Sequence, residues 1–246
     1  MKCIVFSDLH GHLPHLDNSH LVILAGDIAP LSIHHNINAT VKWFYSKFVP
    51  YLLSMKTDFI LIVGGNHDFF LEENPNIFDD LNDSIDSGTI NINGHQVALN
   101  NTQKLPHIIY FDGNTSPISI GGKSFYGMPY TRKHSGNDAF AFSEAKLRVL
   151  YTKIPHSIDV LISHDSPFNP DFQPDDNVYG RSFDESFGSV PLFDAIQKRN
   201  IKYCFSGHIH SERQDSYLIN KTQCFNVGLV EDDSYAQLSH PLVINI

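Results

Sequence analysis

Five short apolar segments of the chain are each followed by residues that can bind metal ions. The five motifs are Asp8-Leu9-His10, Gly26-Asp27, Gly65-Asn66-His67-Asp68, Ser163-His164-Asp165 and Gly207-His208-Ile209-His210. Imidazole and carboxylate side chains together are typical ligands of transition metals. Asp-x-His and Gly-Asp alone are weak signals, because a polar residue after a strand is usually a turn residue, whereas Gly-Asn-His-Asp and Gly-His-x-His are each moderate signals. Their joint occurrence in one chain indicates a metal site.

The candidate ligands are too numerous for a single tetrahedral ion. They are two aspartates, one asparagine and four histidines: Asp8, His10, Asp27, Asn66, His164, His208 and His210. Such a set suits two ions that share one carboxylate. Two ions about 3.5 to 4 Å apart can hold a hydroxide between them and bind phosphate oxygens. The sequence therefore predicts two divalent transition-metal ions that support phosphoester hydrolysis, and manganese, iron and zinc are all compatible with these ligands.

The motifs need strands that bring them together. Apolar, β-branched runs predict buried strands at residues 3–6, 21–24, 59–63, 159–162 and 202–205, and each motif follows one of these runs. In open α/β sheets, ligands bind beyond the carboxyl ends of the strands. The five strand ends are therefore expected to converge on one crevice.

Helical patterns alternate with these strands. The apolar spacing over residues 41–52 predicts an amphipathic helix, which Pro50 is expected to kink or end. Ser143 is predicted to cap a second helix. Ser189 is predicted to cap a third helix that ends at Asn200.

Two other stretches carry the turn signals of antiparallel hairpins. The strands expected in them are residues 107–111, 118–120 and 123–126, and then 216–219, 223–227 and 242–244. Parallel units beside antiparallel ones predict an α/β fold with two packed mixed sheets and helices outside them. Residues 72–104 are polar and rich in asparagine, and they are expected to form a lid or an excursion from the fold.

Composition excludes several classes of protein. The 246 residues are 41% hydrophobic and no linker divides them, so residues 1–246 are expected to form a single domain. The formal charge of -10 opposes the binding of long nucleic acids. The longest apolar runs fall short of the roughly 18 residues that cross a bilayer. The N-terminal residues lack the pattern of a signal peptide, which predicts a cytoplasmic protein. The oligomeric state stays open.

In this order, the motifs resemble the calcineurin-like metallophosphoesterase family. The resemblance extends from Asp8 to His210 and on to Asn226-Val227-Gly228. It implies a four-layer sandwich of two β-sheets and flanking helices. It also implies one ion held by Asp8, His10, Asp27 and His210, and a second held by Asp27, Asn66, His164 and His208. Asp27 would bridge the ions, and His67 would be a general acid or a phosphate-stabilising group.

Departures from the family pattern narrow the substrate class. Phosphoprotein phosphatases of the family carry an Asp-Arg-Gly element after the second motif, whereas this chain has Ile28-Ala29-Pro30. The strand end Tyr126-Gly127-Met128-Pro129 resembles the small phosphodiesterases of the cyclic-nucleotide type. His164 is followed by Asp165-Ser166-Pro167, where those relatives usually carry Gly-Pro-Pro.

These observations predict a metal-dependent enzyme that hydrolyses small phosphodiesters, such as cyclic or other nucleotides. A phosphomonoesterase is the alternative reaction, and a non-catalytic scaffold of the same fold is the alternative from another class. The scaffold is disfavoured because every ligand position is kept. Arg132 is a candidate for binding a substrate phosphate. The other histidines are expected to be solvated or locally hydrogen-bonded: His12, His15, His20, His34, His35, His95, His107, His134, His156 and His240.

Overall fold

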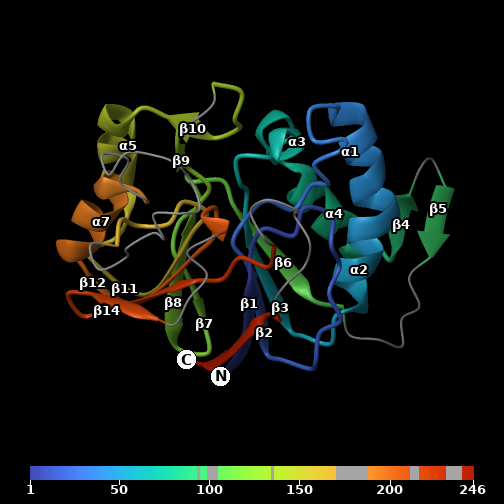
Figure 1. Ribbon diagram of the computed structural model, residues 1–246. Coiled ribbons are helices and arrows are strands. Elements are labelled where there is room, and N and C mark those ends of the chain that lie inside the picture. Colours follow the sequence, from blue (N-terminus) through green and yellow to red (C-terminus); the bar gives the residue numbers. More distant parts are fainter. Residues whose placement is uncertain (93–94, 99–104, 134–135, 170–187, 211–215, 231–239) are drawn as a thin grey trace.

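Two mixed β-sheets lie face to face at the centre of the molecule, and helices cover their outer sides (Figure 1). The computed structural model describes all residues except 93–94, 99–104, 134–135, 170–187, 211–215 and 231–239. The predicted α/β class, with two mixed sheets flanked by helices, is confirmed. Among the described residues, no helix is both long and apolar enough to cross a membrane.

The first sheet has five strands in the order β15-β1-β2-β3-β6. The strands β1 (Lys2–Phe6), β2 (Leu21–Leu24), β3 (Phe59–Val63) and β6 (His107–Phe111) run parallel to one another. The last strand, β15 (Leu242–Asn245), pairs with β1 in the antiparallel direction. The strands predicted at residues 3–6, 21–24 and 59–63 are therefore confirmed, and they are neighbours in the sheet.

The second sheet has six strands in the order β13-β14-β12-β11-β8-β7. Its centre is parallel and consists of β14 (Thr222–Asn226), β12 (Asn200–Ser206), β11 (Ser157–Ser163) and β8 (Lys123–Met128). Antiparallel partners, β13 (Tyr217–Ile219) and β7 (Ile118–Ile120), close its two edges. The hairpins predicted at these two edges are confirmed.

The hairpin predicted between residues 107–111 and 118–120 is wrong. Strand β6 pairs with β3 in the first sheet, whereas β7 pairs with β8 in the second. The turn residues Asp112-Gly113-Asn114 carry the chain from one sheet to the other. The Asp112 carboxylate accepts hydrogen bonds from the backbone N–H groups of Asn114 and Thr115, a local pattern that serves a crossover as well as a hairpin. The strand predicted at 242–244 likewise leaves the hairpin before it and joins the first sheet.

Apolar side chains from both sheets meet between them. Alternate residues of the buried strands point into this layer, and those in between point toward the helices. In β1, Val5 faces the layer between the sheets and Phe6 faces the helices. In β12, Phe205 faces the layer between the sheets and Cys204 faces the helices. Both faces of these strands are therefore buried, which explains their unbroken apolar sequences.

Helices cover each sheet on its outer side (Figure 1). The first sheet is covered by α1 (Ile37–Trp43), α2 (Val49–Ser54) and α4 (Ile77–Asp86), with the short α3 (Phe69–Glu73) near the strand ends. The second is covered by α5 (Glu144–Leu150), a 3-10 turn called η2 (Tyr151–Lys153), and α7 (Val190–Gln197). Ser143 and Ser189 cap α5 and α7 as predicted, but α7 ends at Gln197 because Asn200 already begins β12.

The prediction that Pro50 kinks or ends the helix is wrong, because the chain stays helical through it. A π-helical turn, η1 (Phe44–Phe48), joins α1 to α2, and Pro50 occupies the first turn of α2. The N–H of Val49 donates to the carbonyl of Phe44, which is the wider hydrogen-bond spacing of a π-helix. A proline lacks the N–H that an α-helix interior requires and clashes with the preceding turn. The wider turn before Pro50 therefore lets the chain stay helical.

The stretch at residues 72–104 contains the end of α3, helix α4 and a two-stranded antiparallel hairpin of β4 (Thr89–Ile92) and β5 (His95–Ala98). Figure 1 shows this hairpin on the outer side of α4, away from the strand ends that carry the motifs. The described residues thus form the excursion that was one of the two predictions, while 93–94 and 99–104 lie outside them. A second small pair, β9 (Thr131–Arg132) and β10 (Ala141–Phe142), lies near those strand ends.

Replacing Phe205 by alanine should lower the free energy of unfolding by about 3 to 5 kcal/mol, because its fully buried ring fills the layer between the sheets. Urea denaturation at a fixed metal concentration measures the change. Leu218→Ala in β13 is the control, because that side chain is 68% exposed and its removal should change the stability by less than about 0.5 kcal/mol. Equal effects of the two substitutions would contradict this description of the core.

Candidate metal centre

The carboxyl ends of β1, β2 and β3 from the first sheet and of β11 and β12 from the second lie at one edge of the molecule. Backbone hydrogen bonds connect the loops that follow them. The N–H of Asp8 donates to the carbonyl of Gly26, and that of His10 donates to the carbonyl of Asp27. Across the second sheet, the N–H of Gly207 donates to the carbonyl of His164. The five motifs therefore converge, as the sequence predicts, and both sheets contribute ligands.

Four of the seven candidate ligands have a left-handed backbone conformation. The φ angles are 54° at Asp8, 43° at His10, 53° at Asp27 and 71° at His208. In the described part of the chain, six residues other than glycine have a positive φ, so most of them lie in this site. Such conformations cost free energy in non-glycine residues and concentrate at functional sites. The backbone is thus bent to direct these side chains inward.

Asp8, His10 and His210 form the first group of ligands. Their ligand atoms all lie within 4.8 Å of one another. His210 Nε2 lies 3.3 Å from Asp8 Oδ1 and 3.4 Å from His10 Nε2. These three residues belong to the set that the resemblance implies for one ion.

Asn66, His164 and His208 meet in a second group. The side-chain oxygen of Asn66 lies 3.0 Å from His164 Nε2 and 2.9 Å from His208 Nδ1. His164 Nδ1 donates to the carbonyl oxygen of Ala25 at 2.8 Å, which leaves Nε2 free to face the site. The described residues therefore bring together the members of the second implied set.

Asp27 lies between the two groups. Its Oδ2 is 3.3 Å from His164 Nε2 on one side and 3.8 Å from His10 Nε2 on the other. Its Oδ1 accepts the backbone N–H of His67 at 2.8 Å. A carboxylate that reaches both groups has the position required of a ligand shared by two ions.

The charges of these residues fit divalent cations. Although burial opposes ionisation, the imidazoles of His210 and His164 hold the pKa of Asp8 below its usual value, and His164 and His67 act similarly on Asp27. Loss of solvent lowers the pKa of His10 to about 4 and that of His208 to about 3, so both keep a lone pair for a ligand. Ionised carboxylates beside neutral imidazoles are the protonation states that metal binding requires.

The raised pKa of His164 also indicates that this site suits a positive charge. Burial alone would lower its pKa, but the charge of Asp27 and a hydrogen bond to it raise the value to about 10. Asp8 and Asp27 form no ion pair with a lysine or arginine among the described residues. The buried carboxylates therefore stabilise a positive charge at this place, which a bound cation would supply.

Two glycines of the motifs allow this close approach. Gly26 has a φ of +100°, and a Cβ there would collide with the ring of His164. A Cβ at Gly207 would collide with the side chains of Ser7 and Asp8. Glycine is thus required because the ligand-bearing loops touch.

Asp68 supports the centre without facing it, and no role was predicted for it from the sequence. Its buried carboxylate accepts the backbone N–H groups of Ile28, Ala29 and Gly65, all at about 2.9 Å. Burial, and then the charge of Asp27, raise its pKa to about 7. Asp68 therefore joins the loop that carries Asp27 to the loop that carries Asn66. Its place in the motif Gly65-Asn66-His67-Asp68 is the signal that could have identified it.

Asn226 holds the loop that contains His208 and His210. Its side-chain N–H donates to the carbonyl of Ile209 at 2.7 Å, and its side-chain oxygen accepts the N–H of Gly228 at 3.0 Å. Ser166 donates to the carbonyl of Gly207 at 2.7 Å. These polar side chains tie the loop that carries His208 and His210 to the second sheet.

His67 lies beside the first group of ligands and also beside His34. Its ring centroid is 5.3 Å from that of His10, and its Nδ1 is 2.9 Å from His34 Nδ1. His34, expected to be solvated or locally hydrogen-bonded, lies in the turn before α1 and contacts the candidate general acid. No sequence signal marked it, because only the tertiary fold brings that turn to the end of β3.

Arg132 lies at the edge of the site, in β9. Its backbone N–H donates to Asp165 Oδ2 at 3.2 Å. Burial raises the pKa of Asp165 to about 6, against the opposing charges of His164 and Arg132. The guanidinium is therefore near a buried carboxylate next to a candidate ligand, and its contact with a substrate phosphate stays a prediction.

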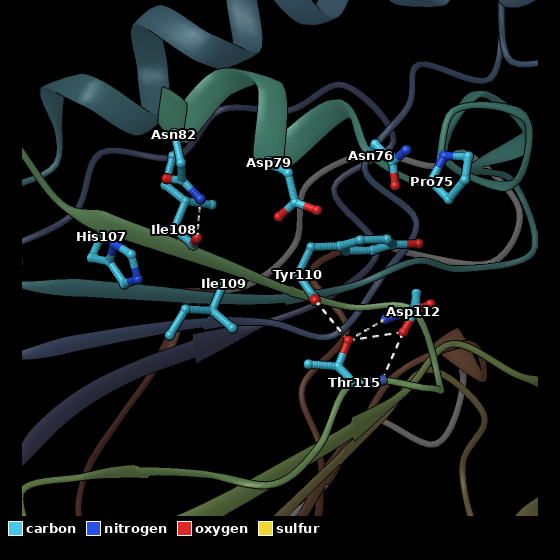
Figure 2. Close-up of a pocket in the computed structure, with 10 residues that line it drawn as sticks. All are labelled: Pro75, Asn76, Asp79, Asn82, His107, Ile108, Ile109, Tyr110, Asp112 and Thr115. Carbon is cyan, nitrogen blue, oxygen red and sulfur yellow. Dashed lines mark hydrogen bonds between the residues drawn. The ribbon is translucent and has the colours of Figure 1, made fainter. Parts of the chain in front are cut away.

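A separate cavity of about 370 Å³ lies between α4 and β6 (Figure 2). Its lining includes Asp79, Asn82 and Asp112, and among the described residues that line it none is a candidate ligand. His107 lies at this cavity and is exposed. His134, in contrast, lies outside the described residues, and so does the side chain of His95.

Comparison with known proteins agrees with this geometry. The family model described as calcineurin-like phosphoesterase matches residues 1–212. The chain belongs to the calcineurin-like phosphoesterase family. Proteins of this family are calcineurin-like phosphoesterases, which are metal-dependent hydrolases. Members of this family typically bind two metal ions, for which the clusters described above are the candidates.

One curated protein is similar to this family member over part of its length. It is the probable rhamnogalacturonate lyase C of Emericella nidulans, with 23% identity over 170 residues. The match covers 68% of this chain but only 14% of the lyase. The chain therefore corresponds to a small part of that protein.

Replacing Asp68 by asparagine should weaken the centre indirectly, because an amide nitrogen cannot accept the backbone N–H groups. We expect the free energy of unfolding to fall by about 1 to 3 kcal/mol and metal affinity to fall by about 10-fold to 100-fold. Urea denaturation and metal titration measure the two changes. Asp112→Asn is the control, since Asp112 also accepts backbone N–H groups but lies in the crossover between the sheets. Unchanged metal affinity in Asp68→Asn would contradict the role assigned to Asp68.

Proposed function

We propose that the chain is a phosphodiesterase that hydrolyses small phosphodiesters, with cyclic or other nucleotides as the expected substrates. The observation that carries the hydrolytic centre is the position of Asp27, whose Oδ2 lies 3.3 Å from His164 Nε2 and 3.8 Å from His10 Nε2. Two groups of ligands that share a carboxylate are suited to displacement at phosphorus.

The preference for diesters is supported by the strand end Tyr126-Gly127-Met128-Pro129. This segment resembles that of the small phosphodiesterases of the cyclic-nucleotide type. Met128 is paired with Ser163 in the second sheet, so the segment lies beside the loop of His164. The chain also has Ile28-Ala29-Pro30 where phosphoprotein phosphatases of the family carry Asp-Arg-Gly.

In this proposal, the two ions are manganese, iron or zinc, and the residues divide as the resemblance implies. One ion is held by Asp8, His10, Asp27 and His210, and the other by Asp27, Asn66, His164 and His208. When bound, two such ions lower the pKa of a water molecule and neutralise charge on the phosphate oxygens. The carboxylates and imidazoles of the chain orient this chemistry, because their loops are held by backbone hydrogen bonds.

His67 would donate a proton to the leaving oxygen. Its backbone N–H is anchored on Asp27 Oδ1 at 2.8 Å, and its ring is edge-on to that of His10. Both ions can be completed without it, which leaves its Nε2 for proton transfer. Arg132 would bind a non-reacting phosphate oxygen through its guanidinium.

Two alternatives make different predictions. A phosphomonoesterase would use the same ligands but would prefer a terminal phosphate. A non-catalytic scaffold is disfavoured, because proteins of that kind would be expected to replace ligand positions that this chain keeps. The lyase activity named for the relative belongs to a protein of which the match covers 14%, and it forms no part of the proposal.

A panel of phosphomonoesters, linear diesters and cyclic nucleotides, assayed with manganese, iron or zinc, tests the proposal. We expect activity to disappear on chelation, to return with a divalent transition metal, and to show a higher kcat/KM for diesters than for monoesters. A preference for monoesters would favour the phosphomonoesterase, and a chain that binds no transition metal would favour the scaffold. Full activity after verified removal of metal would exclude a metal-dependent reaction.

His67→Ala should lower kcat by roughly 100-fold to 10,000-fold, the usual contribution of a general acid or base. The loss should be largest for alkoxide leaving groups such as a ribose oxygen, and smaller for a nitrophenolate, which leaves without a proton. Metal content should hardly change. His20→Ala, at a surface position where the ring accepts the N–H of Lys2, is the control. An equal loss for all leaving groups would point to phosphate binding instead of proton donation.

A further inference from the structure

A cluster of histidines, His34, His35 and His67, lies outside the ligand set. His34 is its central member. The centroid of its ring is 4.8 Å from that of His67 and 3.8 Å from that of His35. His35 in turn lies against Phe69, with ring centroids 4.8 Å apart. His67 is thus held from two directions, by Asp27 at its backbone and by His34 at its ring.

The turn that carries His34 is fixed at the start of α1. The side chain of Asn36 caps this helix by accepting the N–H of Ala39. The Thr40 hydroxyl donates to the carbonyl of Ile33 at 2.8 Å, and the N–H of Asn36 donates to the same carbonyl at 2.8 Å. The backbone of the turn that carries His34 is therefore held by the start of α1.

The contact between His34 and His67 joins the Nδ1 atoms of the two rings at 2.9 Å, so one nitrogen must donate and the other must accept. Burial, followed by the neighbouring charges of His67 and His35, lowers the pKa of His34 to about 4. His34 is therefore neutral near neutral pH, and it can offer the lone pair of Nδ1 to its partner. A His67 that is ready to act as an acid carries protons on both ring nitrogens, and its Nδ1–H then donates to His34.

We propose that His34 is a positioning residue for His67: it accepts the Nδ1–H of His67, fixes the orientation of the ring, and directs the Nε2–H toward the leaving oxygen. This inference rests on the proposed function, in which His67 is the general acid. After donation, His67 keeps the Nδ1–H and its hydrogen bond, so the ring does not need to turn between the two protonation states.

A neutral acceptor has a specific advantage at this position. A carboxylate in the place of His34 would also orient the ring, but its negative charge would hold the proton on His67. An imidazole acceptor orients the ring without that charge. The arrangement therefore suits a residue that donates a proton.

Three variants test the proposal in the metal-loaded protein. His34→Ala removes the acceptor, and His34→Asn keeps an acceptor, because the Asn side-chain oxygen can occupy the place of Nδ1. His35→Ala is the matched control, since His35 is the next residue and its ring contacts that of His34, while the hydrogen bond of its ring is to Asn137 and not to His67. We expect His34→Ala to lower kcat for ribose leaving groups by between about 10-fold and 100-fold, below the ceiling set by the acid itself. His34→Asn and His35→Ala should stay within about threefold of the unmodified protein.

The double variant His34→Ala/His67→Ala separates positioning from a general structural effect. Two residues that act as one unit are not additive, so the double variant should be as slow as His67→Ala alone. The loss in His34→Ala should also shrink for a nitrophenolate leaving group, as for His67→Ala. Multiplicative losses, or an equal loss for every leaving group, would overturn the proposal.

A spectroscopic measurement that does not depend on turnover completes the test. In the zinc-loaded protein, the ¹⁵N shifts of the His67 ring report which nitrogen carries the proton in the neutral form. The shifts should change in His34→Ala and be largely restored in His34→Asn, with zinc content constant. Unchanged shifts in His34→Ala would overturn the inference. If the loss in His67→Ala does not depend on the leaving group, the proposed role of His67 as the acid is wrong. If His67→Ala behaves as expected but the loss in His34→Ala multiplies with it in the double variant, only the positioning role of His34 is wrong.

Discussion

Repulsion between two buried carboxylates is the constraint on which the rest of the structure depends. Asp8 and Asp27 are almost fully buried, and their ligand atoms lie within 4.8 Å of each other. Burial of two like charges is unfavourable by several kcal/mol unless positive charge compensates them. Histidine rings surround the pair, and the pKa of His164 is raised to about 10 as a result. The centre is therefore built to be completed by cations.

The fold tolerates this arrangement because its stability comes from elsewhere. Left-handed φ angles at Asp8, Asp27 and His208, and loops that touch at glycine, all cost free energy locally. The strands that end there are apolar on both faces and form a continuous core with the helices. Rigid strand ends can then hold strained loops in one geometry, which a site on a mobile loop could not do.

The sequence predicts those features that local patterns encode. The five strands and their motifs could be predicted, because an apolar run and the polar residues after it are neighbours in the chain. The path of β6 could not, since Asp112-Gly113-Asn114 has the same local chemistry in a crossover as in a hairpin. The contacts of His34 and Asp68 were missed for a related reason. Each depends on a loop from a distant strand, 33 residues away for His34 and 40 for Asp68.

The ligands come from both sheets, and this origin links metal affinity to the stability of the packing between the sheets. Asp8, His10, Asp27 and Asn66 follow strands of the first sheet, whereas His164, His208 and His210 follow strands of the second. Ions bound by both sets would link the loops of the first sheet to those of the second. Their binding energy would then appear partly as resistance of the two layers to separation. A substitution in the apolar layer between the sheets would then lower the metal affinity under conditions in which the chain is still folded.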